Sequence, residues 1–194
     1  MLTFALYCKP KGNNMKTVKL WDKTFALSYP SEAIQHDIDK VAETINNDFR
    51  NGEQPIFLSV LNGSFMFTAD LLKRVNFSCE VSFVKLASYQ GTSSTGEVNQ
   101  LIGLTENLEG KHVIIVEDIV DTGHTLTKLY KLVQERHAAS IRIATLLYKP
   151  ESYHGKINID YIGKSIPNDF IVGYGLDYDG LGRNLADIYT LAQE

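Results

Sequence analysis

Few features of the sequence point to a specialised structural class. Its 194 residues include only two cysteines, Cys8 and Cys79, which match neither a CxxC redox pair nor a zinc-binding pattern. No apolar run is long enough to span a bilayer, and the short apolar start lacks the basic leader of a signal peptide. We therefore expect reduced thiols in a cytoplasmic protein that has no membrane partner.

An excess of basic residues is also lacking. The formal net charge is -4, whereas proteins that bind nucleic acid usually carry a basic face or stripe. We therefore expect no nucleic acid as a partner, and local chemistry must hold any anionic ligand. Because low-complexity tracts are missing and 44% of the residues are hydrophobic, residues 1–194 should form a single globular domain.

Strand-like and helix-like segments alternate along the middle of the chain. Aliphatic and β-branched runs predict buried strands at residues 56–61, 81–86, 113–116, 141–147 and 170–172. Apolar residues at helical spacing predict helices at residues 32–50, 65–74 and 125–136. This alternation predicts an α/β protein whose central, mostly parallel sheet is flanked by helices.

The two ends of the chain and one internal segment depart from this pattern. Residues 1–14 include a polar stretch before Met15, and we expect them to be a flexible extension. Residues 89–99 are rich in Gly, Ser and Thr, which is typical of a mobile loop that closes over an active site. From Pro150 onward, prolines and closely spaced glycines predict a cap on the sheet instead of further strand and helix pairs.

The most informative segment is residues 112–126, with the sequence HVIIVEDIVDTGHTL. It predicts a strand that ends in two adjacent carboxylates, followed by a short loop and a helix that begins near Thr125. Ligands of open parallel sheets bind beyond the carboxyl ends of the strands. Unpaired N–H groups at a helix N-terminus favour a phosphate by roughly 0.3 to 1 kcal/mol. Gly123 permits close approach of the backbone, and Thr122 and Thr125 add hydroxyl donors.

Three carboxylates make a plain phosphate site improbable in this segment. Glu117, Asp118 and Asp121 would repel a bare anion, so the ligand should also carry hydroxyl groups or a cation. A sugar phosphate with Mg²⁺ meets this condition, because carboxylates accept hydrogen bonds from ribose hydroxyls and bind magnesium or its water ligands. In this arrangement Asp121 faces the reacting centre.

The string VEDIVDTGHTL closely resembles the phosphoribosyl pyrophosphate signature of the type I phosphoribosyltransferases. From about Trp21 onward, the chain is similar to the hypoxanthine branch of that family, most clearly at residues 57–71, 86–98, 146–150 and 169–183. The resemblance implies the type I phosphoribosyltransferase fold, with a small hood built from the N-terminal segment and about residues 150–194. It also implies a homodimer or homotetramer.

The resemblance further implies roles for individual residues. The phosphoribosyl group would be bound by Glu117, Asp118, Thr122, Gly123, His124 and Thr125. Pyrophosphate would be bound by Asn62, Gly63, Arg183, Ser88 and Tyr89. The purine would be bound by Lys149 at O6, by stacking on Phe170, and by main-chain groups near Ile171 and Asp177. Mg²⁺ would be held by Asp177, Glu117 and Asp118, and a proton of the base would pass to Asp121.

Two positions depart from some members of the family. Asn62 stands where they have a basic residue, and His124 stands where they have lysine. Main-chain N–H groups can still bind pyrophosphate at the first position, and a neutral imidazole adds little charge at the second. The strength of anion binding at both positions therefore stays open.

The implied reaction belongs to purine salvage. The 5-phosphoribosyl group of phosphoribosyl pyrophosphate passes to N9 of hypoxanthine, and of guanine, with Mg²⁺ as cofactor. Lys149 argues against adenine, because a donor at C6 does not suit an amino group. A xanthine-preferring enzyme remains an alternative. Another alternative is a regulator that senses phosphoribosyl pyrophosphate and binds nucleic acid; such a protein should show a basic face. A third is a structural protein that retains a relic of the site.

Overall fold

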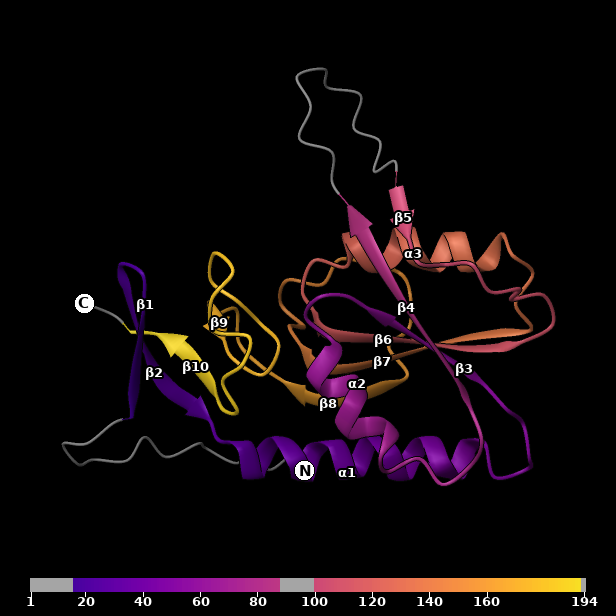
Figure 1. Cartoon of the computed structure of the whole chain (residues 1–194), viewed down its shortest axis with the longest axis horizontal. Coiled ribbons are helices and arrows are strands. Elements are labelled where there is room, and N and C mark those ends of the chain that lie inside the picture. Colours follow the sequence, from indigo (N-terminus) through magenta and orange to yellow (C-terminus); the bar gives the residue numbers. More distant parts are fainter. Residues whose placement is uncertain (1–15, 88–99, 193–194) are drawn as a thin grey trace, which may run out of the picture.

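The computed structural model describes residues 16–87 and 100–192, and a six-stranded sheet forms its centre (Figure 1). The strand order is β5-β4-β3-β6-β7-β8, and neighbouring strands are parallel except for β4 and β5. The predicted α/β architecture with a mostly parallel sheet is therefore confirmed. The strands are β3 (Ile56–Val60), β4 (Glu80–Ala87), β5 (Gln100–Ile102), β6 (His112–Val120), β7 (Ser140–Tyr148) and β8 (Tyr161–Ser165).

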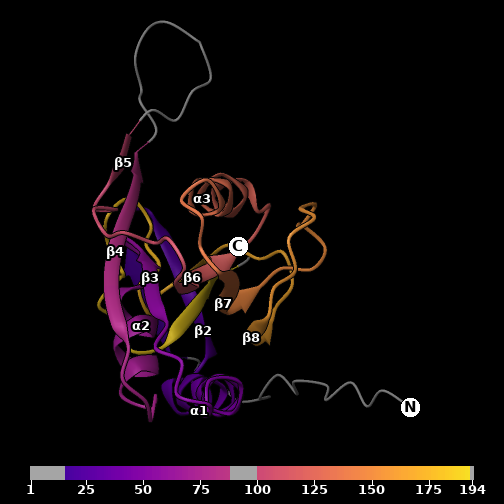
Figure 2. The ribbon, with the colours of Figure 1, turned by 90° about the vertical axis from the view of Figure 1, so that its right-hand side faces the viewer.

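Helices cover both faces of this sheet (Figures 1 and 2). The helices α1 (Ser31–Asp48) and α2 (Phe65–Leu72) lie on one face, and α3 (His124–Gln134) lies on the other. All three were predicted from apolar spacing, with ends that differ by two residues or fewer. Along the chain, α1 precedes β3, α2 lies between β3 and β4, and α3 lies between β6 and β7, as the alternation predicted.

Alternation of side chains along the strands separates the two layers of the core. Successive residues of a strand point to opposite faces, so Ile114 of β6 packs under α1 and α2, while Ile115 packs under α3. The apolar stripe of α3 consists of Leu126, Leu129 and Val133, all of which are buried. Each such side chain contributes about 1.5 to 3 kcal/mol by burial, which fixes the start of α3 against the end of β6.

A second, smaller sheet stands at one end of the main sheet (Figure 1). It is antiparallel, with the order β1-β2-β10-β9, and Phe25, Val172 and Tyr189 form its core. This sheet confirms the hood that the family resemblance implied. Its strands are β1 (Thr17–Leu20), β2 (Lys23–Tyr29), β9 (Ile171–Val172) and β10 (Ile188–Leu191).

Two boundaries differ from the sequence predictions. The chain does not leave the main sheet at Pro150, because β8 pairs in parallel with β7. No helix lies between these strands, so the alternation of strands and helices gave no signal for β8. The strand β6 also continues past the two carboxylates to Val120, which is buried and pairs with Tyr148 of β7. Glu117 and Asp118 therefore lie within a strand.

Some sequence expectations fall on parts of the chain that the structure does not cover. Residues 1–14, the expected extension, lie outside the described residues, as does the expected loop at 89–99. Within the described ranges, no helix has the length and apolar character needed to cross a membrane.

Candidate active site

The loop that connects β6 to α3 has the geometry of an anion-binding turn. Gly123 is the N-cap residue of α3 and has a left-handed backbone, with φ 81°. No side chain caps the helix, so the N–H groups of its first turn are available to a ligand. A Cβ atom at residue 123 would lie 2.4 Å from the ring atom Cε2 of Tyr153. Both the backbone angle and the Tyr153 ring therefore require glycine here.

A small cavity of about 100 Å³ lies against this loop. Its walls include Asp121 and the residues predicted to bind the phosphoribosyl group, with the exception of Asp118. Thr122 Oγ1 and His124 Nδ1 lie 3.0 Å apart, so the two side chains support each other beside the loop. The full lining is Glu117, Ile119, Val120, Asp121, Thr122, Gly123, His124, Thr125 and Leu126.

Glu117 is the buried carboxylate of this cavity. It is 6% exposed, and none of the groups that act on its pKa is a hydrogen-bond donor. Burial, together with the nearby charge of Asp118, raises the pKa of Glu117 well above its ordinary range. Burial of a charged carboxylate is unfavourable. A ligand that brings hydroxyl groups or a cation would relieve this cost.

Asp118 faces the opposite side of the sheet from Glu117, as adjacent strand residues must. Its carboxylate packs against Gly63, where a Cβ atom would lie 1.5 Å from Asp118 Oδ2. Asp118 Oδ1 accepts a hydrogen bond from the Ile119 N–H at 2.9 Å. Burial raises the pKa of Asp118 to about 6, although this N–H group and the charge of Arg183 oppose the shift. The two carboxylates predicted as a pair are thus divided between two faces.

Lys149 and Asp121 form an ion pair at the carboxyl ends of β6 and β7. Lys149 Nζ lies 3.0 Å from Asp121 Oδ2. The lysine is 7% exposed, whereas the aspartate side chain is 42% exposed. The backbone supports this pairing, because the Lys149 N–H donates to the carbonyl of Val120 at 3.0 Å. The carboxylate compensates the charge of the buried lysine.

The turn before α2 meets the C-terminal part of the chain at Gly63. The peptide between Leu61 and Asn62 is cis. Gly175 lies so close that a Cβ atom on it would be 2.0 Å from the carbonyl oxygen of Gly63. Gly63 is therefore enclosed between Asp118 on one side and Gly175 on the other. The sequence did not reveal this contact of Gly175. The only signal was that Gly175, which has a positive φ of 99°, lies in a glycine-rich segment.

Asp177 and Arg183 are paired with each other beside this contact. Arg183 Nη2 lies 2.6 Å from Asp177 Oδ1, and Arg183 Nη1 donates to the Gly175 carbonyl at 2.7 Å. The second carboxylate oxygen of Asp177 accepts from the Gly180 N–H at 2.8 Å. The charges of Arg183 and Asp177 both act on Asp118. The predicted metal-binding and pyrophosphate-binding groups of this segment therefore lie near Asp118.

Phe170 and Ile171 stand at the start of β9 in the small sheet. The Phe170 ring is 47% exposed and packs edge to face on Tyr178, with ring centroids 5.9 Å apart. Lys23 Nζ lies 5.8 Å from the Phe170 ring centroid. Ile171 pairs with Thr190 of β10. The exposed ring leaves an aromatic surface open to a flat ligand.

The donor set agrees with magnesium chemistry but is incomplete without substrate. Within the described residues, no group of three or more His, Cys, Asp or Glu side chains converges on one point. Mg²⁺ is commonly held by one or two carboxylates together with substrate oxygens and water. Glu117, Asp118 and Asp177 offer hard oxygen atoms of this kind. These residues therefore fit a metal that arrives with a phosphorylated substrate.

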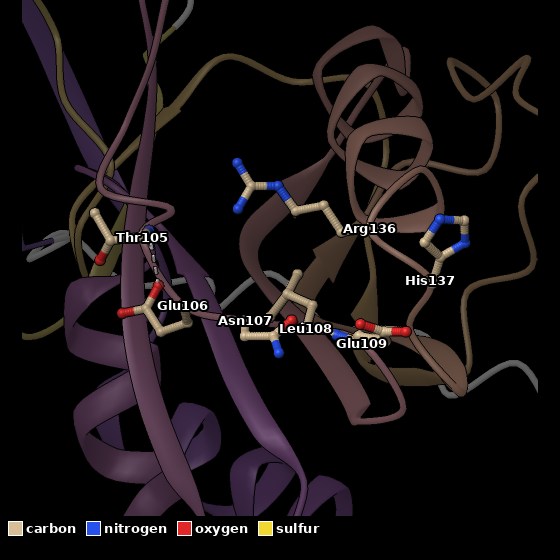
Figure 3. Close-up of a pocket in the computed structure, with 7 residues that line it drawn as sticks. All are labelled: Thr105, Glu106, Asn107, Leu108, Glu109, Arg136 and His137. Carbon is tan, nitrogen blue, oxygen red and sulfur yellow. Dashed lines mark hydrogen bonds between the residues drawn. The ribbon is translucent and has the colours of Figure 1, made fainter.

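A second cavity lies elsewhere. It measures about 360 Å³ and is situated at the C-terminal end of α3, roughly 16 Å along the helix from the loop at its start. Figure 3 shows Arg136 and His137 on one side of it and Glu106 and Glu109 on the other. It shares no residue with the site above, so we do not assign the chemistry to it. Ser88 and Tyr89, predicted to meet pyrophosphate, lie outside the described residues.

Comparisons with known proteins identify the family of the chain. Residues 29–179 match the family model of the phosphoribosyl transferase domain. The chain is 44% identical over 156 residues to the hypoxanthine-guanine phosphoribosyltransferase of Streptococcus pneumoniae, covering 80% of this chain and 86% of the relative. It is 44% identical over 165 residues to the Staphylococcus epidermidis enzyme of the same name, with 84% and 91% covered.

Solved structures give the same result. The hypoxanthine phosphoribosyltransferase of Trypanosoma cruzi superposes with a TM-score of 0.77 and 36% identity, covering 87% of this chain and 97% of the other. The hypoxanthine phosphoribosyltransferase of Staphylococcus aureus gives a TM-score of 0.77 and 38% identity, covering 86% and 90%. The resemblance inferred from the motifs is confirmed, and the chain belongs to the hypoxanthine-guanine phosphoribosyltransferase family.

Proposed function

We propose that the protein transfers the 5-phosphoribosyl group of phosphoribosyl pyrophosphate to N9 of hypoxanthine or guanine, releasing pyrophosphate, in cytoplasmic purine salvage. The observation that carries this proposal is the cavity beside the β6–α3 loop. It combines the uncapped start of α3 with the buried carboxylate of Glu117. The helix start suits a phosphate, and the carboxylate suits the hydroxyl groups of a ribose.

The loop residues fix the sugar phosphate. The N–H groups from Thr122 to Thr125 take the 5-phosphate, and the Thr122 and Thr125 hydroxyls donate to its oxygens. Glu117 accepts hydrogen bonds from the ribose. Holding the ribose in this way presents C1 to the base and lowers the entropic barrier to transfer.

The ion pair between Lys149 and Asp121 provides the contacts to the base. A 6-oxopurine presents O6 and N7 on one edge, and the two side chains lie 3.0 Å apart. Lys149 donates to O6, while Asp121 accepts the proton that leaves N7 as N9 bonds to C1 and pyrophosphate departs. General-base catalysis of this kind contributes about 10² to 10⁴ in rate.

The remaining groups bind the leaving pyrophosphate and the plane of the base. Asp118 and Asp177, and Glu117 on the other face of β6, would offer oxygen atoms to Mg²⁺, which would supply positive charge opposite the pyrophosphate. Arg183 and the N–H groups of Asn62 and Gly63 bind the same group, to which Ser88 and Tyr89 are also assigned. His124 lies beside the 5-phosphate. Phe170 stacks on the purine, and the main chain of Ile171 and Asp177 meets its exocyclic edge.

Assembly into a homodimer or homotetramer is also proposed. Phe65, Val81 and Phe83 are 41%, 43% and 42% exposed. Phe83 pairs with Ser59, whose hydroxyl accepts a hydrogen bond from Thr68 of α2, so Phe83 lies on the α2 side of the sheet. A second copy would cover this apolar surface. Light scattering should give a multiple of the 21.8 kDa chain mass, and Phe83→Glu should lower it.

A base panel and one substitution test the reaction. With phosphoribosyl pyrophosphate and Mg²⁺, we expect nucleotide from hypoxanthine and guanine, little from xanthine, and none from adenine. Asp121→Asn should lower kcat at least about 100-fold, whereas Glu109→Gln, at the far end of α3, should not. Full turnover by the Asp121→Asn protein would remove Asp121 from the proton-accepting role.

A further inference from the structure

Tyr174 is a buried tyrosine that the reaction described above does not use. It is 2% exposed and has a left-handed backbone, with φ 48°. A non-glycine residue rarely adopts this conformation unless its surroundings hold it there. Its N–H donates to the carbonyl of Leu185 at 2.8 Å. The side chain must therefore be anchored well enough to maintain an unfavourable backbone angle.

The anchor is a polar network on α1 and α2. The Tyr174 hydroxyl donates to Asp70 Oδ2 at 2.5 Å, and Gln35 Nε2 donates to the same oxygen at 2.9 Å. Arg74 Nη2 donates to Gln35 Oε1 at 2.9 Å, and Lys73 Nζ lies 2.9 Å from Asp70 Oδ1. Burial alone would raise the pKa of Asp70, but these donors bring it below its ordinary value. Asp70 is therefore a charged acceptor for the tyrosine.

The residue that follows Tyr174 makes the close contact with the turn before α2. Gly175 packs on the Gly63 carbonyl, and Gly63 packs on the Asp118 carboxylate. The Gly175 carbonyl also accepts the hydrogen bond of Arg183, which pairs with Asp177. Any rotation of the backbone at Tyr174 would shift this stack of groups, because neighbouring atoms leave no free space at either glycine.

We infer that Tyr174 is a positioning residue for the pyrophosphate and metal side of the site. Its hydroxyl, bound to Asp70, fixes the segment from Gly175 to Asp177 against Gly63. The inference rests on the proposed function, since it assigns pyrophosphate and Mg²⁺ to the groups that this stack aligns. It does not involve the ion pair of Lys149 and Asp121, which lies beyond the carboxyl ends of β6 and β7.

Steady-state kinetics of Tyr174→Phe test this inference. Loss of the hydroxyl should raise KM for phosphoribosyl pyrophosphate and the half-saturating Mg²⁺ concentration about tenfold, equivalent to about 1.4 kcal/mol. The KM for hypoxanthine should change less than about twofold, because the base contacts remain. Tyr189→Phe is the matched control, since Tyr189 is also 2% exposed and donates to an aspartate, Asp187, at 3.1 Å.

A second pair of variants separates positioning from general packing. Asp70→Asn keeps an oxygen that can accept from Tyr174 and should retain near-normal KM values, whereas Asp70→Ala should reproduce the defect of Tyr174→Phe. Equal kinetic constants for Tyr174→Phe and Tyr189→Phe, or for the two Asp70 variants, would overturn the inference. Absence of turnover in the unsubstituted protein would instead contradict the proposed function itself.

Discussion

Replacing Asp118 by asparagine should stabilise the ligand-free protein at pH 8 while weakening its uptake of Mg²⁺ and phosphoribosyl pyrophosphate. The carboxyl group keeps its proton up to about pH 6 in the folded protein, compared with an ordinary value of 3.8. Stability linked to this group is therefore fully present below pH 3.8 and is lost as the pH rises through about 6. Asparagine cannot ionise, so it avoids that loss.

The magnitude follows from the two pKa values. A difference of about two pH units, at about 1.4 kcal/mol each, corresponds to about 3 kcal/mol at pH 8 and about half of that at pH 5. For a chain of this size, this would raise Tm by roughly 6 to 12 °C at pH 8. Asparagine retains a carbonyl oxygen for the Ile119 N–H and a similar volume against Gly63, so little packing should be lost.

Thermal unfolding from pH 5 to pH 8 provides the assay, with the exposed carboxylate variant Glu109→Gln as control. The gain in Tm of Asp118→Asn over the unsubstituted protein should grow with pH. The difference in Tm between Glu109→Gln and the unsubstituted protein should be the same at every pH. A Tm difference that is constant across this range would refute the argument that burial of an ionised Asp118 is costly.

Three further predictions concern the same site. Gly123→Ala should destabilise the protein by about 1 to 3 kcal/mol, because a left-handed alanine costs about 1 to 2 kcal/mol and its Cβ meets Tyr153. In urea titrations, adding Tyr153→Ala to this variant should restore part of the lost stability. Lys149→Met should lower kcat/KM for hypoxanthine about 100-fold or more while calorimetry shows phosphoribosyl pyrophosphate still binding. Calorimetric affinity for Mg²⁺ with phosphoribosyl pyrophosphate should rise with pH through about 6, because the cation needs Asp118 in its carboxylate form.

The local structure of the proposed phosphate-binding loop could be predicted from sequence because its parts are contiguous. A strand, a glycine turn and a helix start follow one another between residues 112 and 126, and short-range geometry then determines where the N–H groups point. The cavity lining from Glu117 to Leu126 confirms that these side chains gather in one place. Had the predicted strand been extended to Val120, the alternation of side chains would also have placed Asp118 on the opposite face of the sheet from Glu117.

Contacts between distant segments could not be predicted in the same way. The stack of Asp118, Gly63 and Gly175 joins three parts of the chain, and only the three-dimensional arrangement shows why two of them are glycines. The ion pair of Lys149 and Asp121 depends on the parallel register of β6 and β7. The strand β8 was missed because the chain reaches it without a helix.

A crystal structure of the protein with Mg²⁺ and phosphoribosyl pyrophosphate tests the central claim most directly. The account predicts the 5-phosphate within hydrogen-bond distance of the N–H groups of residues 122–125, with ribose hydroxyls on Glu117. Density for the sugar phosphate elsewhere, with the start of α3 left without it, would contradict the account.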